Sequence, residues 1–244
     1  MPARITTPFG ATSTAAEVVA GCDLRGRRVV VTGGAAGIGL ETARALASAG
    51  ADVTLAVRDA AAGECAAAAL PGRVAARRLD LADLDSVRAF AAAWDGPLHG
   101  LVANAAIMAL PRRELTADGW ELQLATNHRG HFALAHALHA ALASEGARIV
   151  VVSSGAHLRS PVVFDDLHFT SRPYDPLAAY AQSKTANVLF AAGAAARWAR
   201  DGVTANALMP GAIATGLQRH LDPGYLERAR GSLPLKSPRP AAAI

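Results

Sequence analysis

The chain has 244 residues, of which 52% are hydrophobic and only 5% aromatic, and its formal net charge is +4. This length suits one large domain with a substantial hydrophobic core. No apolar run approaches the roughly 18–20 residues of a membrane span. Pro and polar residues fill residues 1–10, where a signal peptide would have its apolar segment. We therefore expect a cytoplasmic protein without a membrane partner.

The two cysteines, Cys22 and Cys65, stand far apart in the sequence, without a CxxC pair or a nearby histidine cluster. This isolation argues against a disulfide framework and against a zinc site. The arginines occur as scattered doublets rather than as a basic stripe with interleaved aromatic residues. We therefore expect no nucleic-acid partner.

Four histidines fall in one Ala- and Leu-rich stretch at i,i+3 spacing, His128 with His131 and His136 with His139. A metal site could use this spacing, but no carboxylate or cysteine completes the set. We expect these rings to serve packing and solvation, and we predict no metal ligand.

In chain order, residues 1–26 are predicted to be an N-terminal extension with one short helix, because Thr14 and Glu17 have the spacing of a capping box. From residue 27 onward, short β-branched runs alternate with longer Ala- and Leu-rich segments. The expected strands are 27–33, 52–57, 73–79, 98–106 (running into a loop), 147–154 and 203–208. The expected helices are 37–50, 59–70, 81–94, 117–143 and 176–200. This alternation predicts one α/β domain, 27–244, on a doubly wound parallel sheet with helices on both faces.

A glycine-rich stretch, "TGGAAGIG" at 32–39, follows the first predicted strand and opens the first helix. Gly33, Gly37 and Gly39 are spaced G-x-x-x-G-x-G, which differs from the usual GxGxxG of dinucleotide sites. Such glycines let the backbone approach a diphosphate that sits on helix N-terminal amides. Alone, the triplet favours an ordinary turn. Its place after the first strand of an alternating chain favours a dinucleotide site.

Five motifs in order resemble the short-chain dehydrogenase/reductase signature: "TGGAAGIG", "NAA" at 104–106, "SS" at 153–154, "YAQSK" at 180–184 and "PGAIAT" at 210–215. "TNHRGHFAL" and "SKTANVLF" resemble its retinol-dehydrogenase-like branch, with its WW-domain oxidoreductase relatives. The resemblance implies a Rossmann-type fold. The family continues into another helix and a seventh strand, whereas the end of this chain carries no strand pattern. We therefore expect six strands and a C-terminally truncated domain.

The resemblance also implies a cofactor site. Its members would be Gly33, Gly37, Ile38, Gly39, Arg58, Asp80, Leu81, Asn104, Ala105, Ala106, Tyr180, Lys184, Pro210, Gly211, Ile213 and Thr215. Ala106 stands where the family usually has glycine. Asp80 could cap the following helix, contact the adenine of the cofactor, or do both.

The end of the second predicted strand bears on the choice of cofactor. A carboxylate there binds the ribose 2′-OH of NAD, whereas an arginine accommodates the 2′-phosphate of NADP. This chain has Val57 at the family's Asp position, followed by Arg58. We therefore expect NADP(H) rather than NAD(H). Asp59 is expected to cap the following helix.

Tyr180 and Lys184 lie four positions apart on a predicted helix, which places any two side chains on one face. The resemblance makes them catalytic and adds Ser154 and Asn127. A free phenol has a pKa of about 10, and we expect the Lys184 ammonium to lower it. Tyr180 would then be the general acid/base, Ser154 would hold the substrate oxygen, and Asn127 would anchor a water linking Lys184 to solvent. Ser153 is expected only to cap the strand exit.

These expectations describe an oxidoreductase that transfers a hydride between NADP(H) and an apolar alcohol, ketone or aldehyde. The alternative is a non-catalytic dinucleotide-binding or interaction protein left by truncation. The complete Asn–Ser–Tyr–Lys set favours the enzyme. The expected partners are a small-molecule apolar substrate and, as an assembly, a homo-oligomer.

Overall fold

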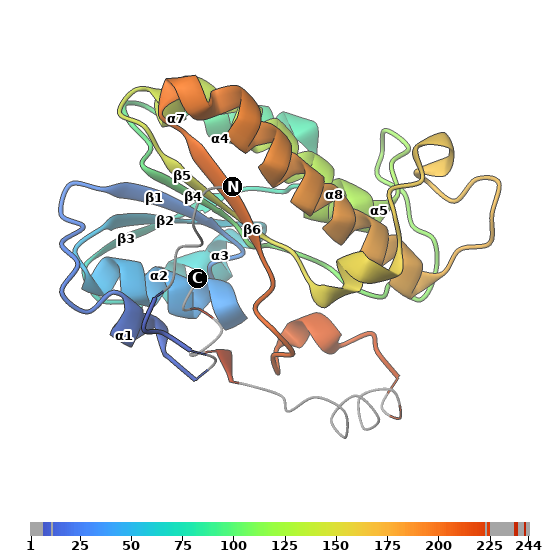
Figure 1. Ribbon diagram of the computed structural model, residues 1–244, viewed down its shortest axis with the longest axis horizontal. Coiled ribbons are helices and arrows are strands. Elements are labelled where there is room, and N and C mark those ends of the chain that lie inside the picture. Colours follow the sequence, from blue (N-terminus) through green and yellow to red (C-terminus); the bar gives the residue numbers. More distant parts are fainter. Residues whose placement is uncertain (1–6, 11, 223, 225–236, 239–241, 243–244) are drawn as a thin grey trace.

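The computed structural model describes residues 7–10, 12–222, 224, 237–238 and 242. Its centre is a six-stranded parallel sheet with the strand order β3-β2-β1-β4-β5-β6 (Figure 1). The strands are β1 (Arg28–Thr32), β2 (Asp52–Val57), β3 (Arg73–Arg78), β4 (Gly100–Ala103), β5 (Arg148–Val152) and β6 (Thr204–Leu208). The predicted doubly wound α/β fold with six strands is confirmed.

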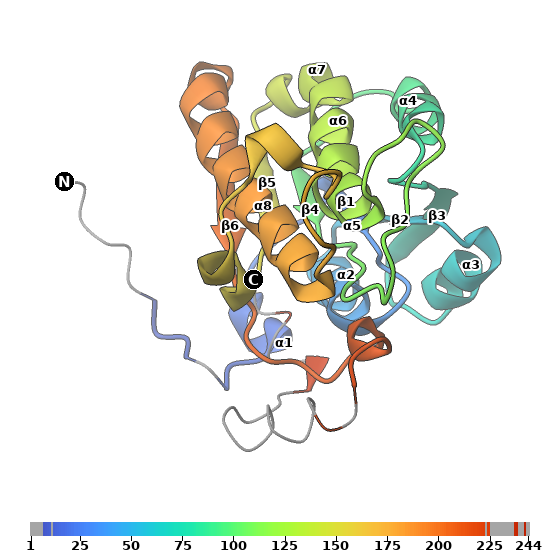
Figure 2. The ribbon, with the colours of Figure 1, turned by 90° about the vertical axis from the view of Figure 1, so that its right-hand side faces the viewer.

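Helices cover both faces of this sheet, as the two perpendicular views show (Figures 1 and 2). One face carries α1 (Ala15–Val18), α2 (Gly37–Ser48) and α3 (Ala60–Ala68). The other carries α4 (Leu84–Ala92), α5 (Leu122–Leu124), α6 (Gly130–Ala137), α7 (His139–Ala143) and α8 (Pro176–Trp198). None of the helices in the described part of the chain combines the length and apolar character needed to cross a membrane.

The sheet separates two hydrophobic cores, because successive side chains of a strand point to opposite faces. On β1, Val30 belongs to the core under α4, α6 and α8, whereas Val31 belongs to the core under α2 and α3. Both valines are fully buried. Burial on both faces explains why β1 reads as a continuous β-branched run rather than as an alternating one.

The short N-terminal helix α1 has the predicted capping box. The Thr14 hydroxyl accepts a hydrogen bond from the Glu17 amide at 3.3 Å, and the Glu17 carboxylate accepts one from the Thr14 amide at 2.5 Å. Ala15 then packs against Ala45 of α2, so the helix is attached to the main domain through small apolar side chains.

The predicted helix over 117–143 is wrong in its start and in its regularity. The chain turns at Gly119 (φ +85°), and Leu115 forms an isolated antiparallel bridge with Glu121. The buried Glu121 carboxylate then accepts hydrogen bonds from the amides of Gln123 and Leu124, which starts α5. Residues Ala125–Arg129 continue as a π-helix before α6. Such π turns are frequent at functional sites.

Gly130, the first residue of α6, allows this helix to pack directly on the backbone that follows β3. A Cβ atom at this position would overlap the Leu81 carbonyl oxygen and lie 2.7 Å from the Leu81 Cβ. We expect Gly130→Ala to lower the free energy of unfolding by about 1–3 kcal/mol, as overpacking does. Urea denaturation measures this.

Gly193 on α8 is the matched control, because its added Cβ would meet only the flexible end of Arg197, at 3.0 Å. Gly193→Ala should leave stability unchanged or raise it by up to about 1 kcal/mol. Equal effects of the two substitutions would contradict the close approach at Gly130.

Candidate active site

Most of the predicted cofactor residues surround the point where the strand order of the sheet reverses, between β1 and β4. The chain leaves β1 toward α2 on one face and leaves β4 toward the helices on the other. Ligands of open α/β sheets bind in the crevice that this divergence creates at the carboxyl ends of the strands. The glycine-rich loop follows β1 and Asn104 follows β4, so both border the crevice.

The glycine loop is a cradle that side chains would fill. Gly33 and Gly37 adopt positive φ values of +66° and +58°, which favour glycine. A Cβ on Gly39 would lie 2.5 Å from the Gly33 carbonyl oxygen and 2.6 Å from Asn104 Nδ2. In the described part of the chain, no side chain caps α2, whose N-cap is Ala36. Its first amides therefore suit a diphosphate, and the cradle fits a dinucleotide.

The other wall of the cradle is held to β1 by hydrogen bonds. Asn104 Nδ2 donates to the Thr32 carbonyl oxygen at 2.8 Å. The amides of Asn104 and Ala105 donate to Thr32 Oγ1 at 2.9 and 3.0 Å. Ala105 also sets the spacing, since a Cβ on Gly33 would lie 3.1 Å from it. Ala106 follows in the same half-buried loop.

Three further predicted residues lie after β2 and β3, at the far end of the crevice. Arg58 directly follows β2 and is exposed, while Asp59 caps α3 by accepting from the Ala62 amide at 3.0 Å. Asp80 does not cap a helix, because Asp83 caps α4.

Asp80 instead accepts from the Ala82 amide at 3.0 Å, within its own turn. Leu81 beside it is buried under α6. Asp80 is half-buried, so the turn leaves part of this residue accessible to solvent.

The loop after β6 returns to the glycine cradle. Thr215 caps the short 3₁₀-helix Gly216–Gln218, and its Cγ2 would lie 3.3 Å from a Cβ on Gly37. Ile213 is buried, and Gly211 (φ +95°) provides the turn that follows Pro210. This brings the 210–215 segment against the glycine loop.

Ile38 behaves differently from the other predicted cofactor residues. Its side chain packs with Ala15 of α1 and Ala45 of α2, away from the crevice. Only its backbone, in the first turn of α2, faces the position that a diphosphate would take.

Tyr180 and Lys184 lie on one face of α8, which runs beside β5 and β6. The helix begins at Pro176, and the Asp175 carboxylate caps it by accepting from two amides at 2.8 Å. Tyr180 is 5% exposed and Lys184 only 2%. Lys184 Nζ donates to the Val152 carbonyl oxygen at the end of β5 (2.8 Å) and lies 5.6 Å from the centroid of the Tyr180 ring. The two side chains are buried together, unlike a solvated helix pair.

The two serines after β5 have different surroundings, and Ser153 does not have the role expected of it. Ser153 does not cap the strand exit: its hydroxyl is buried and donates to the Lys184 carbonyl oxygen at 2.8 Å, which joins β5 to α8. Ser154 caps the 3₁₀-helix Gly155–Arg159, accepting from the Ala156 amide at 3.2 Å. Ser154 also interacts with the Tyr180 phenol and acts to lower its pKa. The structure thus brings Ser154, Tyr180 and Lys184 together.

Asn127 is fully buried in the π-helix, and its side-chain amide is engaged on both sides. Its Oδ1 accepts from the Ile107 amide at 2.8 Å, and its Nδ2 donates to the Ile107 carbonyl oxygen at 2.9 Å and to Ser183 Oγ at 3.0 Å. Asn127 therefore ties the loop after β4 to α8. The backbone carbonyl oxygen of Asn127 lies 2.9 Å from His131 Nδ1.

The expected effect of Lys184 on the phenol is wrong for the protein as it stands. Burial raises the pKa of Tyr180 to about 12, and the interaction with Ser154 opposes this only in part. Burial also lowers the pKa of the Lys184 ammonium to about 7. Desolvation disfavours the charged form of each group, so it determines the direction of both shifts. At neutral pH Tyr180 is a protonated phenol that can donate.

His131 is a residue of this region that the sequence left as packing. It is 1% exposed and links Asn127 to Thr32 by hydrogen bonds. Its position four residues after Asn127 on one helix was the available signal. Among the described residues, no cluster of three or more His, Cys, Asp or Glu is arranged to hold a metal.

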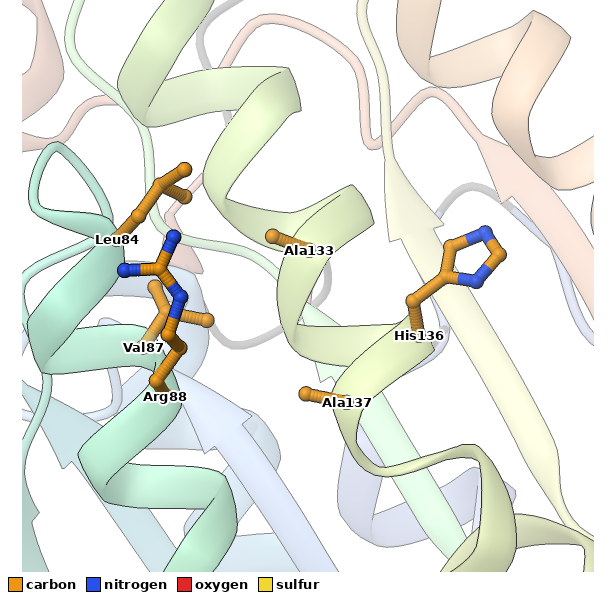
Figure 3. Close-up of a pocket in the computed structure, with 6 residues that line it drawn as sticks. All are labelled: Leu84, Val87, Arg88, Ala133, His136 and Ala137. Carbon is orange, nitrogen blue, oxygen red and sulfur yellow. The ribbon is translucent and has the colours of Figure 1, made fainter. Parts of the chain in front are cut away.

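A surface pocket of about 380 Å³ lies between α4 and α6, outside the crevice (Figure 3). Leu84, Val87 and Arg88 line it from α4, with Ala133, His136 and Ala137 from α6. None of the predicted site residues borders this pocket, so it has no part in the chemistry above.

Comparison with known proteins gives the same assignment as the geometry. The family model for short chain dehydrogenase matches residues 27–225. The chain belongs to the short-chain dehydrogenase family. Members of this family are oxidoreductases that bind a nicotinamide dinucleotide, in agreement with the glycine cradle and the buried tyrosine and lysine.

Among its relatives in the short-chain dehydrogenase family, a Streptomyces lividans protein described as "Probable oxidoreductase" is 65% identical over 205 residues, covering 82% of this chain and 69% of its own. Human retinol dehydrogenase 12 is 45% identical over 206 residues, covering 81% of this chain and 65% of its own. A solved complex of Pseudomonas aeruginosa RhlG with NADP superposes with a TM-score of 0.74 at 28% identity, covering 91% of this chain and 88% of the other. The chain lies in the retinol-dehydrogenase-like branch.

Proposed function

We propose that this chain is an NADP(H)-dependent oxidoreductase that interconverts an apolar alcohol and its ketone or aldehyde, within one catalytic domain formed by residues 27–244. The observation that carries the proposal is the buried pair Tyr180 and Lys184, with Ser154 beside them. Burying a lysine costs free energy unless its charge is paired and hydrogen-bonded, so a buried lysine points to a function. A binding module has no need of a phenol and an ammonium buried side by side, so the non-catalytic alternative is disfavoured.

The glycine cradle at 33–39 would hold the diphosphate, with Asn104 and Thr215 closing the crevice on either side. When bound there, a nicotinamide dinucleotide supplies the hydride for carbonyl reduction. Tyr180 Oη donates the proton that the reduced oxygen needs, and its raised pKa keeps that proton available at neutral pH. Ser154 holds the same oxygen by a second hydrogen bond. In the reverse direction the tyrosinate form of Tyr180 accepts the proton of the alcohol, and the raised pKa makes this form a strong base that is sparsely populated at neutral pH.

Lys184 has two tasks in this proposal. Its ammonium favours the tyrosinate that remains after proton donation, since an opposite charge nearby stabilises the charged form. With a pKa lowered to about 7, Lys184 also exchanges a proton readily near neutrality and can reload Tyr180. The backbone carbonyl of Asn127, within the π-helix, would anchor the water through which this proton reaches solvent.

The preference for NADP(H) is inferred from Arg58, the exposed guanidinium directly after β2. Val57, where a carboxylate would select NAD, is buried and apolar. The NADP complex of Pseudomonas aeruginosa RhlG supports the same choice. A guanidinium can bind a 2′-phosphate bidentately, and only NADP(H) carries one.

We expect Arg58→Ala to weaken NADPH binding roughly 10–100-fold while changing NADH binding by less than about twofold, because only NADPH loses a charge-assisted contact. Fluorescence titration of each cofactor measures this.

Arg73→Ala is the matched control, since Arg73 is an exposed arginine at the start of β3 that pairs with Asp52 at 3.1 Å. It should alter neither affinity. Equal losses of NADPH and NADH in Arg58→Ala, or tighter binding of NADH by the unmodified protein, would overturn the cofactor assignment.

The proposed function is tested by following NADPH oxidation against a panel of apolar aldehydes and ketones, with NADH in parallel. We expect turnover of at least one carbonyl with NADPH. Tight NADPH binding without turnover of any apolar or polar carbonyl would favour the non-catalytic alternative instead.

A further inference from the structure

His131 is a fully buried polar side chain of α6, and it contacts two segments that the proposed mechanism uses. Its Nδ1 lies 2.9 Å from the backbone carbonyl oxygen of Asn127, in the π-helix. Its Nε2 lies 2.8 Å from Thr32 Oγ1, at the end of β1. Thr32 in turn accepts the amides of Asn104 and Ala105, which form a wall of the cofactor cradle.

The partners fix the tautomer of this ring. A carbonyl oxygen only accepts hydrogen bonds, so the Asn127 contact requires the proton on Nδ1. A neutral imidazole then has a bare Nε2, which accepts from the Thr32 hydroxyl. Thr32 has one proton to give, and the 2.8 Å contact to His131 is shorter than the 3.3 Å contact to the Val102 carbonyl oxygen. The hydrogen bonds therefore run in one direction, from the cradle amides through Thr32 and His131 to Asn127.

The ring is also kept neutral. Burial lowers the pKa of His131 to about 4, and the hydrogen bond to the Asn127 carbonyl opposes this only in part. Lys184 from α8 and His128 from the π-helix, the charged or titratable groups that act on it, lower it further. A protonated ring would lose its bond from the Thr32 hydroxyl and add a second cation near Lys184. Both effects favour the neutral tautomer throughout the range in which Lys184 titrates.

We infer that His131 is a positioning residue, which couples the cofactor cradle at Thr32 to the backbone carbonyl of Asn127 and fixes that carbonyl for the proton path from Lys184. The inference rests on the proposed function for the role of that carbonyl. It assigns no contact between His131 and the substrate or cofactor. Asn127 is held at its amide by Ile107 and Ser183, so His131 supplies the restraint on its carbonyl.

Two substitutions separate the two bonds, because Asn places an amide near the position of Nδ1 and Gln places one near that of Nε2. His131→Gln keeps a partner for Thr32 and loses the Asn127 bond. We expect kcat to fall about tenfold, with a displaced pH profile and an unchanged NADPH affinity, since one buried hydrogen bond is lost on the chemical side alone. His131→Asn keeps the hydrogen bond to the Asn127 carbonyl and loses the one from the Thr32 hydroxyl. We expect NADPH to bind about tenfold more weakly, with kcat nearly preserved.

The tautomer is read independently of activity by ¹H–¹⁵N NMR of the histidine rings, with His131→Asn identifying the signal. We expect a neutral ring with the proton on Nδ1 between pH 6 and about 9, since its pKa is lowered to about 4. A protonated ring above pH 6, or a proton on Nε2, would overturn the inference. So would variants that change kcat and NADPH affinity alike, or that lower only the melting temperature.

These readouts separate the inference from the proposed function. A wild-type protein that binds NADPH but reduces no carbonyl contradicts the proposed function. The tautomer and the two NADPH affinities then still decide whether His131 couples the cradle to Asn127.

Discussion

Replacing Tyr180 with Phe should lower the rate of carbonyl reduction about 10²–10⁴-fold, the usual contribution of a general acid. This substitution removes only the hydroxyl group of the phenol, and the ring remains packed beside Lys184. NADPH affinity should stay within about threefold, because the cradle amides and Arg58 rather than the phenol supply most of that binding energy. Stopped-flow measurement of NADPH oxidation gives the rate, and fluorescence titration gives the affinity.

Tyr174→Phe is the matched control for this substitution. Tyr174 is half-buried, and its hydroxyl accepts from Gln123 Nε2 at 2.8 Å and donates to the Glu121 carboxylate at 3.4 Å, outside the site. Its loss should lower the melting temperature while leaving the rate within a few-fold of wild type. A Tyr180→Phe variant that retains a comparable rate would remove Tyr180 from the mechanism.

Replacing Lys184 with Met should reduce turnover about as strongly, roughly 10²-fold or more, because the tyrosinate loses its stabilising charge and its route for reprotonation. Met keeps the length of the side chain, so the packing of α8 on β5 is largely preserved. Steady-state kinetics measures the loss. Turnover near the wild-type rate would mean that another group reprotonates Tyr180.

The same substitution has a distinct effect on stability. The pKa of Lys184 is lowered to about 7 in the folded protein, from its ordinary value of 10.5. Between these values the unfolded chain binds the extra proton, so raising the pH favours the folded state by up to about 1.4 kcal/mol per pH unit. Below pH 7 both states are protonated and the cost of the buried charge is present in full.

Lys184→Met lacks this dependence, so its stability advantage over wild type should be largest below pH 7 and shrink toward pH 10.5. Urea denaturation across pH 6–10 tests this. A constant difference between the two proteins would contradict the lowered pKa.

The sequence predicts the sheet well, because strands such as β1 and β5 are mostly buried and read as β-branched runs between turn residues. Residues 52–57 form β2 with the expected bounds, and the other strands differ by a few residues at their ends. The helix before β5 starts later than its sequence pattern predicts. Its apolar pattern extends back to residue 117, but the turn at Gly119 and the buried cap at Glu121 delay the helix to Leu122. Tertiary contacts, which periodicity does not contain, make that difference.

For the site, the sequence supplied the residues but not their electrostatics. Motif order alone points to Tyr180 and Lys184, and the structure buries them together. Their pKa values depend on how completely water is excluded, which only the packed structure contains. The role of Ser153 has a similar origin, since its hydrogen bond to the Lys184 carbonyl oxygen depends on how α8 packs beside β5. His131 was overlooked because its partners, Thr32 and Asn127, come from distant and irregular segments.

The most direct test of the central claim uses NADPH that carries deuterium at the transferred position. The protein is incubated with this cofactor and the panel of apolar aldehydes and ketones, and the alcohols formed are analysed by mass spectrometry. We expect one deuterium at the former carbonyl carbon of at least one product with the wild-type protein, and none above background with Tyr180→Phe. Alcohol products that lack the deuterium, or equal incorporation by the two proteins, would contradict the account.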